Sequence, residues 1–238
     1  MNQKFFEALS LLDHTKSPGN NRVNPLILKR CALSLTCPIT HIINLSFTTS
    51  TFPTVWKKHK IIPIPKKGDL HSVTNYRPIS LLPIISKVIE AIVHAKLIKF
   101  VRPLLNKSQY GFLSNRSCLT QLLAFTAKIT NHFESKSSAD VIYLDFQKAF
   151  DSVPHGELLY KLWLLGITGP LWFWIKSYLS NRIHYTTVLG GSSTCLPVKL
   201  GVLQGSVLGP LFFFYTSTIY LLLFHIHYHF SLPTILNS

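Results

Sequence analysis

The chain has 238 residues, of which 47% are hydrophobic, and this is enough for the core of one large domain or two small ones. The apolar content excludes a disordered polar tail, and a formal net charge of +15 favours an anionic partner such as nucleic acid or a membrane surface. The four cysteines lack C-x-x-C spacing, which indicates neither a zinc site nor a disulfide framework. We therefore expect Cys31, Cys37, Cys118 and Cys195 to be buried thiols in a reducing compartment.

Residues 1–56 are expected to form a helical N-terminal extension. Phe5, Leu9 and Leu12 share one helical face, and no cleavage-site pattern follows, so we expect an amphipathic helix and not a signal peptide. Pro25 and Pro38 each suit the first turn of a helix, which predicts helices over residues 26–35 and 39–47. The protein is accordingly expected to be intracellular, in the cytoplasm or the nucleus.

The next segment is strongly basic, because residues 57–107 contain eleven Lys and Arg against two acidic residues. Residues 57–65 favour a strand, but their prolines should confine it to a sheet edge or an irregular strand. A turn at residues 66–69 and an extended segment at residues 75–82 follow. Pro83 then suits the start of a helix reaching about residue 101, and Ser117 the N-cap of a helix reaching about residue 133.

A short apolar run at residues 141–144 has the length of a buried strand and ends at Asp145. Asp145 is one of only nine acidic residues, against twenty-four Lys and Arg. We therefore interpret it as a ligand of a divalent metal ion in a site that handles phosphate. Asp151, a few residues later, is interpreted as a helix cap.

The last part of the chain combines helices, a hairpin and an apolar end. Helices are predicted over residues 157–165 and from Pro170, and a β-hairpin over residues 182–200. Residues 211–226 are strongly apolar but shorter than the ~20 residues that a bilayer span needs, so an exposed, aggregation-prone tail is expected. Three alternating histidines, His225, His227 and His229, have no carboxylate or cysteine beside them and do not indicate a metal site.

Three sequence blocks occur in a fixed order. They are Lys66-Lys67-Gly68-Asp69 with Asn75-Tyr76-Arg77-Pro78-Ile79-Ser80, then Tyr143-x-Asp145-x-x-x-Ala149-Phe150-Asp151, then Gly201-Val202-Leu203-Gln204-Gly205-Ser206-x-Leu208-Gly209-Pro210. Together they resemble the reverse transcriptase of a LINE-type, non-LTR retrotransposon, from about Lys4 to about Leu211. The resemblance implies an α+β right-hand polymerase fold with fingers at residues 57–138, an incomplete palm at 139–211 and a divergent apolar tail at 212–238.

The resemblance also implies a metal-dependent chemistry. Phosphoryl transfer in this family uses two divalent cations, Mg²⁺ by expectation, which carboxylates hold against the reacting oxygens. Asp145 matches the first of these carboxylates, and the backbone carbonyl of Phe146 is implied as a further metal contact. The implied partners are an RNA template, a DNA primer and deoxynucleoside triphosphates.

Six residues match the nucleotide-binding positions of the family. The triphosphate is expected to contact Lys66 or Lys67 and Arg77, the sugar to lie on Phe150, and the nucleotide pocket to be lined by Gln204 and Gly205.

The chain departs from the family in its second catalytic motif. After Pro210 nothing resembles the Ala-Asp-Asp motif, and no Asp or Glu occurs after Glu157. One carboxylate would then face two mutually repelling cations, so we expect weak metal binding and no efficient polymerisation by this polypeptide alone. The alternatives are a non-catalytic nucleic-acid-binding remnant, or a membrane-attached protein.

Overall fold

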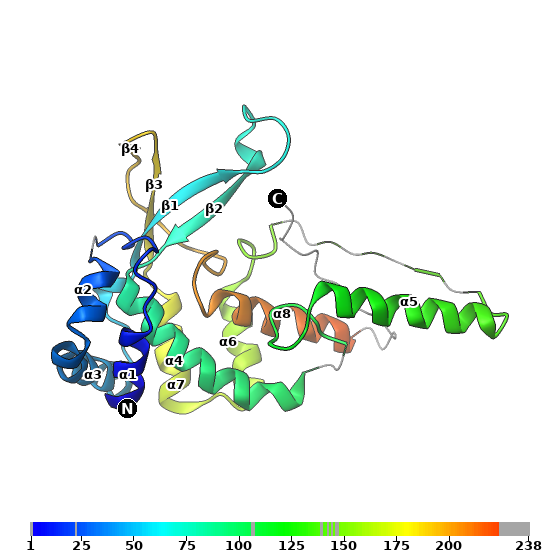
Figure 1. Cartoon of the computed structure of the whole chain (residues 1–238), viewed down its shortest axis with the longest axis horizontal. Helices are drawn as coiled ribbons and strands as arrows, with labels where there is room; N and C mark the ends of the chain where they lie inside the picture. Colours follow the sequence, from blue (N-terminus) through cyan, green and yellow to red (C-terminus); the bar gives the residue numbers. More distant parts are fainter. Residues whose placement is uncertain are drawn as a thin grey trace.

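The computed structural model describes residues 2–223, except residues 22, 106–107, 139, 142, 144 and 146–147. A body of packed helices lies beneath a small, projecting β-sheet, and one long helix extends away from that body (Figure 1). The mixed α+β class expected from the sequence is confirmed.

Helices α1 (Asn2–Ser10), α2 (Pro25–Arg30) and α3 (Ala32–Thr48) form the N-terminal region. The prediction that Pro38 begins a separate helix is wrong, because Pro38 lies inside α3. Buried residues on both sides of it, among them Thr36 and Ile39, keep the helix packed on the core. The carbonyl of Ser34, which loses its amide partner at the proline, belongs to an exposed residue and can bond to water instead.

The sheet combines strands from distant parts of the sequence, in the order β2-β1-β3-β4 with β5 also paired to β3. Its strands are β1 (Lys58–Pro65), β2 (Tyr76–Leu81), β3 (Ile183–Val188), β4 (Gly191–Ser192) and β5 (Leu196–Pro197). The hairpin expected over residues 182–200 is confirmed, since β4 and β5 both pair antiparallel with β3.

Strand β1 lies between β2 and β3, whereas its prolines predicted a sheet edge or an irregular strand. It pairs antiparallel with β2 along residues 60–65 and parallel with β3 along residues 58–61 only. Pro63 and Pro65 therefore lie in the half of β1 where β2 is its single neighbour. An amide is dispensable on that open side, which explains how an interior strand tolerates two prolines.

Four helices supply most of the core. They are α4 (Ile84–Val101), α6 (His155–Leu164), α7 (Gly169–Leu179) and α8 (Gly209–Leu223). Short 3₁₀ turns lie at Thr54–Trp56, Val73–Asn75 and Arg102–Leu104. The expectation of an exposed tail is wrong for residues 211–216, which are buried. The ring of Phe213 stacks on Phe150, so this apolar run is core and not surface.

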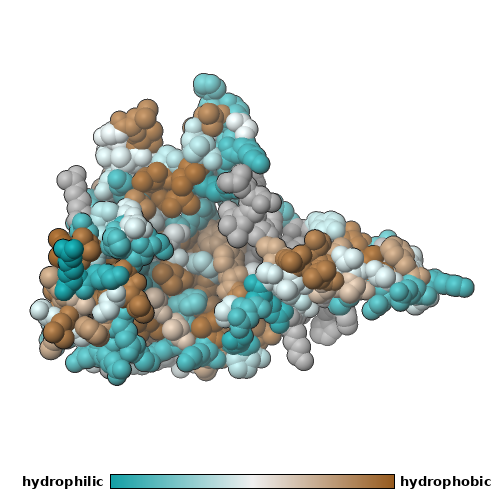
Figure 2. Space-filling model, viewed as in Figure 1, coloured by the Kyte–Doolittle hydropathy of each residue, from teal (hydrophilic) through white to brown (hydrophobic). Residues whose placement is uncertain are grey.

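Helix α5 (Cys118–Glu134) starts at the predicted cap: Ser117 and Thr120 form a capping box. No residue of α5 is buried, and Leu119, Leu122 and Leu123 are exposed on it. Figure 2 shows apolar side chains gathered along this arm, which is drawn to the right of the body.

The cysteines do not occupy the expected interior positions. Cys31, Cys37, Cys118 and Cys195 are all exposed, so the prediction of buried thiols is wrong. Cys37 belongs to the solvent side of α3, and Cys118 begins the projecting α5. Within the described part of the chain, no helix is long and apolar enough to cross a membrane.

Candidate functional site

The loop of residues 201–208, here named the Gln204 loop, lies between residues 148–153, here named the Asp151 turn, and the end of β2. The amides of Gly201 and Val202 donate to the carbonyls of Val153 and Phe150, at 2.8 and 2.7 Å. On its other side, the Gln204 carbonyl accepts a hydrogen bond from the Ser80 amide at 2.7 Å. All three sequence blocks therefore meet at this loop.

Two glycines make these close approaches possible. Gly201 has φ +87°, and a Cβ there would lie 2.7 Å from the Asp151 carbonyl oxygen. Gly205 has φ +102°, and its Cβ would lie 2.7 Å from the Ser80 carbonyl oxygen. Both positions need a residue without a side chain, because L-residues rarely adopt this backbone region. Gly205 therefore lies directly against the backbone of β2.

Asp151 faces the Gln204 loop. Gln204 Nε2 donates to Asp151 Oδ1 at 3.4 Å. Desolvation raises the pKa of Asp151, and the Gln204 hydrogen bond and the charges of Lys148 and Lys66 oppose that rise. The interpretation of Asp151 as a helix cap is wrong for α6, whose N-cap is Pro154 and has no side-chain cap bond.

The predicted strand before Asp145 is absent where the structure describes it. Residues 141, 143 and 145 have no regular structure and are exposed, with Tyr143 75% exposed. A strand is stable only when neighbouring strands pair with it, and the described strands form a sheet elsewhere in the chain. The prediction of a buried strand is therefore wrong for these residues. Phe146, the expected backbone contact for the metal, lies outside the described residues.

The described side chains do not fit a resident metal ion. Among them no group of three or more His, Cys, Asp or Glu side chains gathers in a way that could hold one. Asp145 is exposed. Carboxylate and water oxygens must surround Mg²⁺ octahedrally, so an isolated exposed carboxylate would hold it weakly.

Phe150 is a core residue. It is 8% exposed, stacks on Phe213 of α8 with ring centroids 5.1 Å apart, and meets the edge of Phe112 at 6.1 Å. Only a small part of its ring is left for a ligand to contact.

The predicted triphosphate contacts lie on the β1–β2 hairpin. The Lys66 amide donates to the Asn75 carbonyl at 2.8 Å, and its ammonium donates to the Thr74 carbonyl at 3.5 Å. Lys67 is exposed beside it, and Arg77 is half-buried on β2 opposite Ile64. Among the described residues, none of these three cations contacts the Gln204 loop, although the charge of Lys66 acts on the pKa of Asp151.

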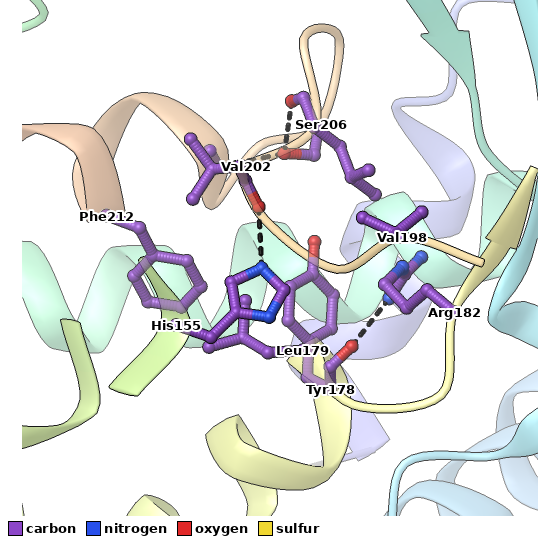
Figure 3. Close-up of a pocket in the computed structure, with 11 residues that line it drawn as sticks. His155, Tyr178, Leu179, Arg182, Val198, Val202, Ser206 and Phe212 are labelled. Atoms are coloured by element: carbon purple, nitrogen blue, oxygen red, sulfur yellow. Dashed lines mark hydrogen bonds between the residues drawn. The ribbon is translucent and has the colours of Figure 1, made fainter. Parts of the chain in front are cut away.

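A small cavity lies on the inner side of the Gln204 loop, lined by His155, Tyr178, Arg182 and Ser206 among others (Figure 3). His155 Nε2 lies 2.8 Å from the Gly201 carbonyl oxygen, and Arg182 donates to the Tyr178 carbonyl at 2.9 Å. The cavity measures about 10 Å³, close to the size of one water molecule and far too small for a nucleotide. This cavity is therefore not the nucleotide site.

Comparison with known proteins assigns the chain to a family. The model described as "Reverse transcriptase (RNA-dependent DNA polymerase)" matches residues 64–229, more than half of the chain. The chain belongs to the reverse transcriptase family. The expected kinship with retrotransposon polymerases is confirmed.

Its relatives are polymerases of mobile elements. The chain is 34% identical over 214 residues to the "Probable RNA-directed DNA polymerase from transposon BS" of Drosophila melanogaster, covering 89% of the chain and 24% of that protein. It is 37% identical over 172 residues to the "RNA-directed DNA polymerase from mobile element jockey" of the same species, covering 71% of the chain and 19% of that protein. The R2 Pol polyprotein of Popillia japonica is 29% identical over 73% of the chain. The chain spans about a quarter or less of the length of these relatives.

The sequence-based predictions for this reverse transcriptase family member missed the buried polar residues behind the Gln204 loop. Glu90 and Arg182 are almost completely buried, as is Tyr178, which stacks against the Arg182 guanidinium at 4.6 Å. The only signal in the sequence is a single acidic residue inside the apolar stripe of α4.

Proposed function

We propose that this chain forms the fingers (residues 57–138) and part of the palm (residues 139–211) of an RNA-directed DNA polymerase, and one wall of its deoxynucleoside triphosphate site. The hydrogen bonds that join the Gln204 loop to the Asp151 turn and to Ser80 at the end of β2 support this most directly. Charge-assisted bonds from lysine and arginine suit a triphosphate.

In this proposal, Lys66, Lys67 and Arg77 contact the triphosphate, and Gln204 and Gly205 line the nucleotide pocket. The exposed rim of Phe150 would lie beneath the sugar. An RNA template paired with a DNA primer would run along the basic β1–β2 hairpin. The proposed location of the protein is inside the cell. Family members use divalent cations, and we propose that Mg²⁺ binds weakly here through Asp145.

We further propose that these 238 residues do not polymerise by themselves, because they contain one of the family's catalytic carboxylates and no acidic residue after Glu157. In a primer-extension assay with magnesium and deoxynucleotides, wild type and Asp145→Asn should give the same background. Incorporation by wild type that Asp145→Asn abolishes would contradict this. An authentic reverse transcriptase run in parallel shows that the template, primer and nucleotides are competent.

A non-catalytic nucleic-acid-binding role is favoured by the cations of the hairpin. Lys58, Lys60, Lys66, Lys67 and Arg77 all lie on or beside β1 and β2. Lysines that contact phosphates release counterions, which makes binding strongly dependent on salt.

Lys67→Ala is expected to weaken binding to an RNA–DNA hybrid and to reduce the slope of log K against log salt by about one. Lys4→Ala, which removes a lysine of equal charge from α1, serves as the control and should leave the slope unchanged. The measurement is fluorescence anisotropy across a series of salt concentrations. Equal slopes for the two variants would show that the hairpin does not contact the hybrid.

A further inference from the structure

Glu90 is a completely buried carboxylate in the apolar core. It belongs to α4, where its neighbours Ile89 and Val93 are also buried. Removing an ionised carboxylate from water costs several kcal/mol unless hydrogen bonds replace the lost hydration. Its hydrogen-bond partners therefore indicate what this residue does for the fold.

Two of those partners are backbone amides of the Gln204 loop. Glu90 Oε2 accepts hydrogen bonds from the amides of Val207 at 2.8 Å and Leu208 at 3.3 Å, and Oε1 accepts one from Ser86 Oγ at 3.0 Å. The partners at 207 and 208 lie 117 and 118 residues further along the chain. The carboxylate thus joins α4 to the loop across the core.

The same bonds close the N-terminus of α8. The Leu208 carbonyl accepts a hydrogen bond from the Phe212 amide at 2.9 Å, so helical hydrogen bonding starts at Leu208. The amides that precede Phe212 at this end therefore have no partner within the helix. Negative charge is stabilising at this end of a helix. The Ser206 hydroxyl oxygen accepts a hydrogen bond from a further amide, that of Gly209, at 2.8 Å.

The Gln204 loop is consequently held at both ends and in its middle. Gly201 and Val202 bond to the Asp151 turn, Gln204 bonds to Ser80 of β2, and Val207 bonds to Glu90. Only two residues separate Gln204 from Val207. Release of the Val207 and Leu208 amides would therefore free the backbone next to Gln204 and Gly205.

We propose that Glu90 is a positioning residue: by holding the Val207 and Leu208 amides, it sets the place of Gln204 and Gly205 against β2 and the Asp151 turn. This inference rests on the proposed role of that loop in deoxynucleotide binding. Burial raises the pKa of Glu90, while the buried charge of Arg182 and the hydrogen bonds from Val207, Ser86 and Leu208 oppose the rise.

The test compares Glu90→Gln with Val93→Ala. Val93 is buried on the same helix, so its truncation destabilises the core without removing a bond to the Gln204 loop. For each variant, amide hydrogen exchange at Val207 and Leu208 is measured relative to global unfolding. Binding of a deoxynucleoside triphosphate with magnesium is measured by calorimetry.

Glu90→Gln is expected to speed exchange at both amides, and to weaken nucleotide binding, by about tenfold, because glutamine supplies one acceptor oxygen where the carboxyl group supplies two. Val93→Ala should change neither by more than about twofold, since it leaves those hydrogen bonds in place. Equal exchange at the two amides in Glu90→Gln and Val93→Ala would overturn the proposal, as would unchanged nucleotide affinity in Glu90→Gln.

Two further outcomes are also decisive. If Glu90→Gln does not fold, Ser86→Ala removes one of the three bonds to the carboxylate and should produce a smaller increase in exchange at the same two amides; no increase overturns the proposal. If wild type binds no nucleotide, the proposed function of the loop fails. Exchange at Val207 and Leu208 then still decides whether Glu90 holds the loop.

Discussion

Trp174→Ala is expected to lower the free energy of unfolding by about 3–5 kcal/mol, the cost of deleting a large buried aromatic side chain. Trp174 of α7 is completely buried. Its indole packs against Phe47, Phe52 and Tyr178, with ring centroids 5.0, 5.4 and 6.0 Å away. The substitution would leave a cavity between α3, α7 and the segment that leads into β1.

The loss of stability should come from the lost packing, because the substitution leaves no buried polar group without a hydrogen bond. Trp174 Nε1 donates to Ser46 Oγ at 2.9 Å, but the Ser46 hydroxyl itself donates to the Thr51 carbonyl at 2.6 Å and keeps that bond in the variant. Urea unfolding followed by circular dichroism measures the difference. Trp163→Ala is the matched control, because Trp163 of α6 is 56% exposed and should cost far less. Equal losses in the two variants would contradict the assignment of Trp174 to the core.

Acidification is expected to remove about 3 kcal/mol of stability between pH 7 and pH 4 through His59 alone, from the difference between its folded and unfolded pKa values. His59 of β1 is 1% exposed, and its ring lies 5.8 Å from that of His184 on β3. Desolvation, with the charges of Arg182 and His184, lowers the pKa of His59 to about 3, while a backbone hydrogen bond at Lys57 acts in the opposite direction.

Stability falls on acidification because the unfolded chain binds a proton at His59 more tightly than the folded chain does. The unfolded imidazole titrates near 6.5 and the folded one near 3, so the unfolded chain takes up protons first as the pH falls. The contribution of His59 to stability is therefore complete above pH 6.5 and decreases toward pH 3. Glu90 changes stability in the opposite direction, since burial raises its pKa, and His184 acts like His59.

The free energy of unfolding is measured against pH for wild type and for His59→Gln. Glu90 and His184 are present in both proteins, so their contributions cancel in the difference between the two curves. The variant should lose about 3 kcal/mol less than wild type between pH 7 and pH 4. His71→Gln, at an exposed histidine, is the matched control for the loss of an imidazole. Parallel curves for wild type and His59→Gln would show that His59 is not buried as a neutral imidazole.

Local signals in the sequence predicted the helices and their ends well. Ser117 caps α5, Pro83 precedes α4, and the hairpin after Arg182 forms as expected. Such signals act through bonds between residues close in the chain, so they need no knowledge of the rest of the fold. Pro38 and Asp151 are exceptions: burial of the residues that flank Pro38 in α3 outweighs the lost hydrogen bond, and α6 begins after Pro154 without a side-chain cap.

The sequence predicted Lys66 and Gln204 as site residues but indicated Asp151 only as a helix cap. The fold places the Gln204 amide 3.4 Å from the Asp151 carboxylate, a contact between distant segments. The burial of Phe150 against Phe213 and the exposure of Asp145 depend on what packs beside each of them. No pattern within one segment contains that information.

The sequence by itself determined the family, the basic character of residues 57–107 and the positions of most helices, because motif order, charge and local capping are properties of the linear chain. Only the tertiary structure decided that β1 is interior, that the cysteines are exposed and that the run after Pro210 is core. It also decided that Glu90 holds the Gln204 loop, since a hydrogen bond between residues 117 positions apart exists only after the chain has folded.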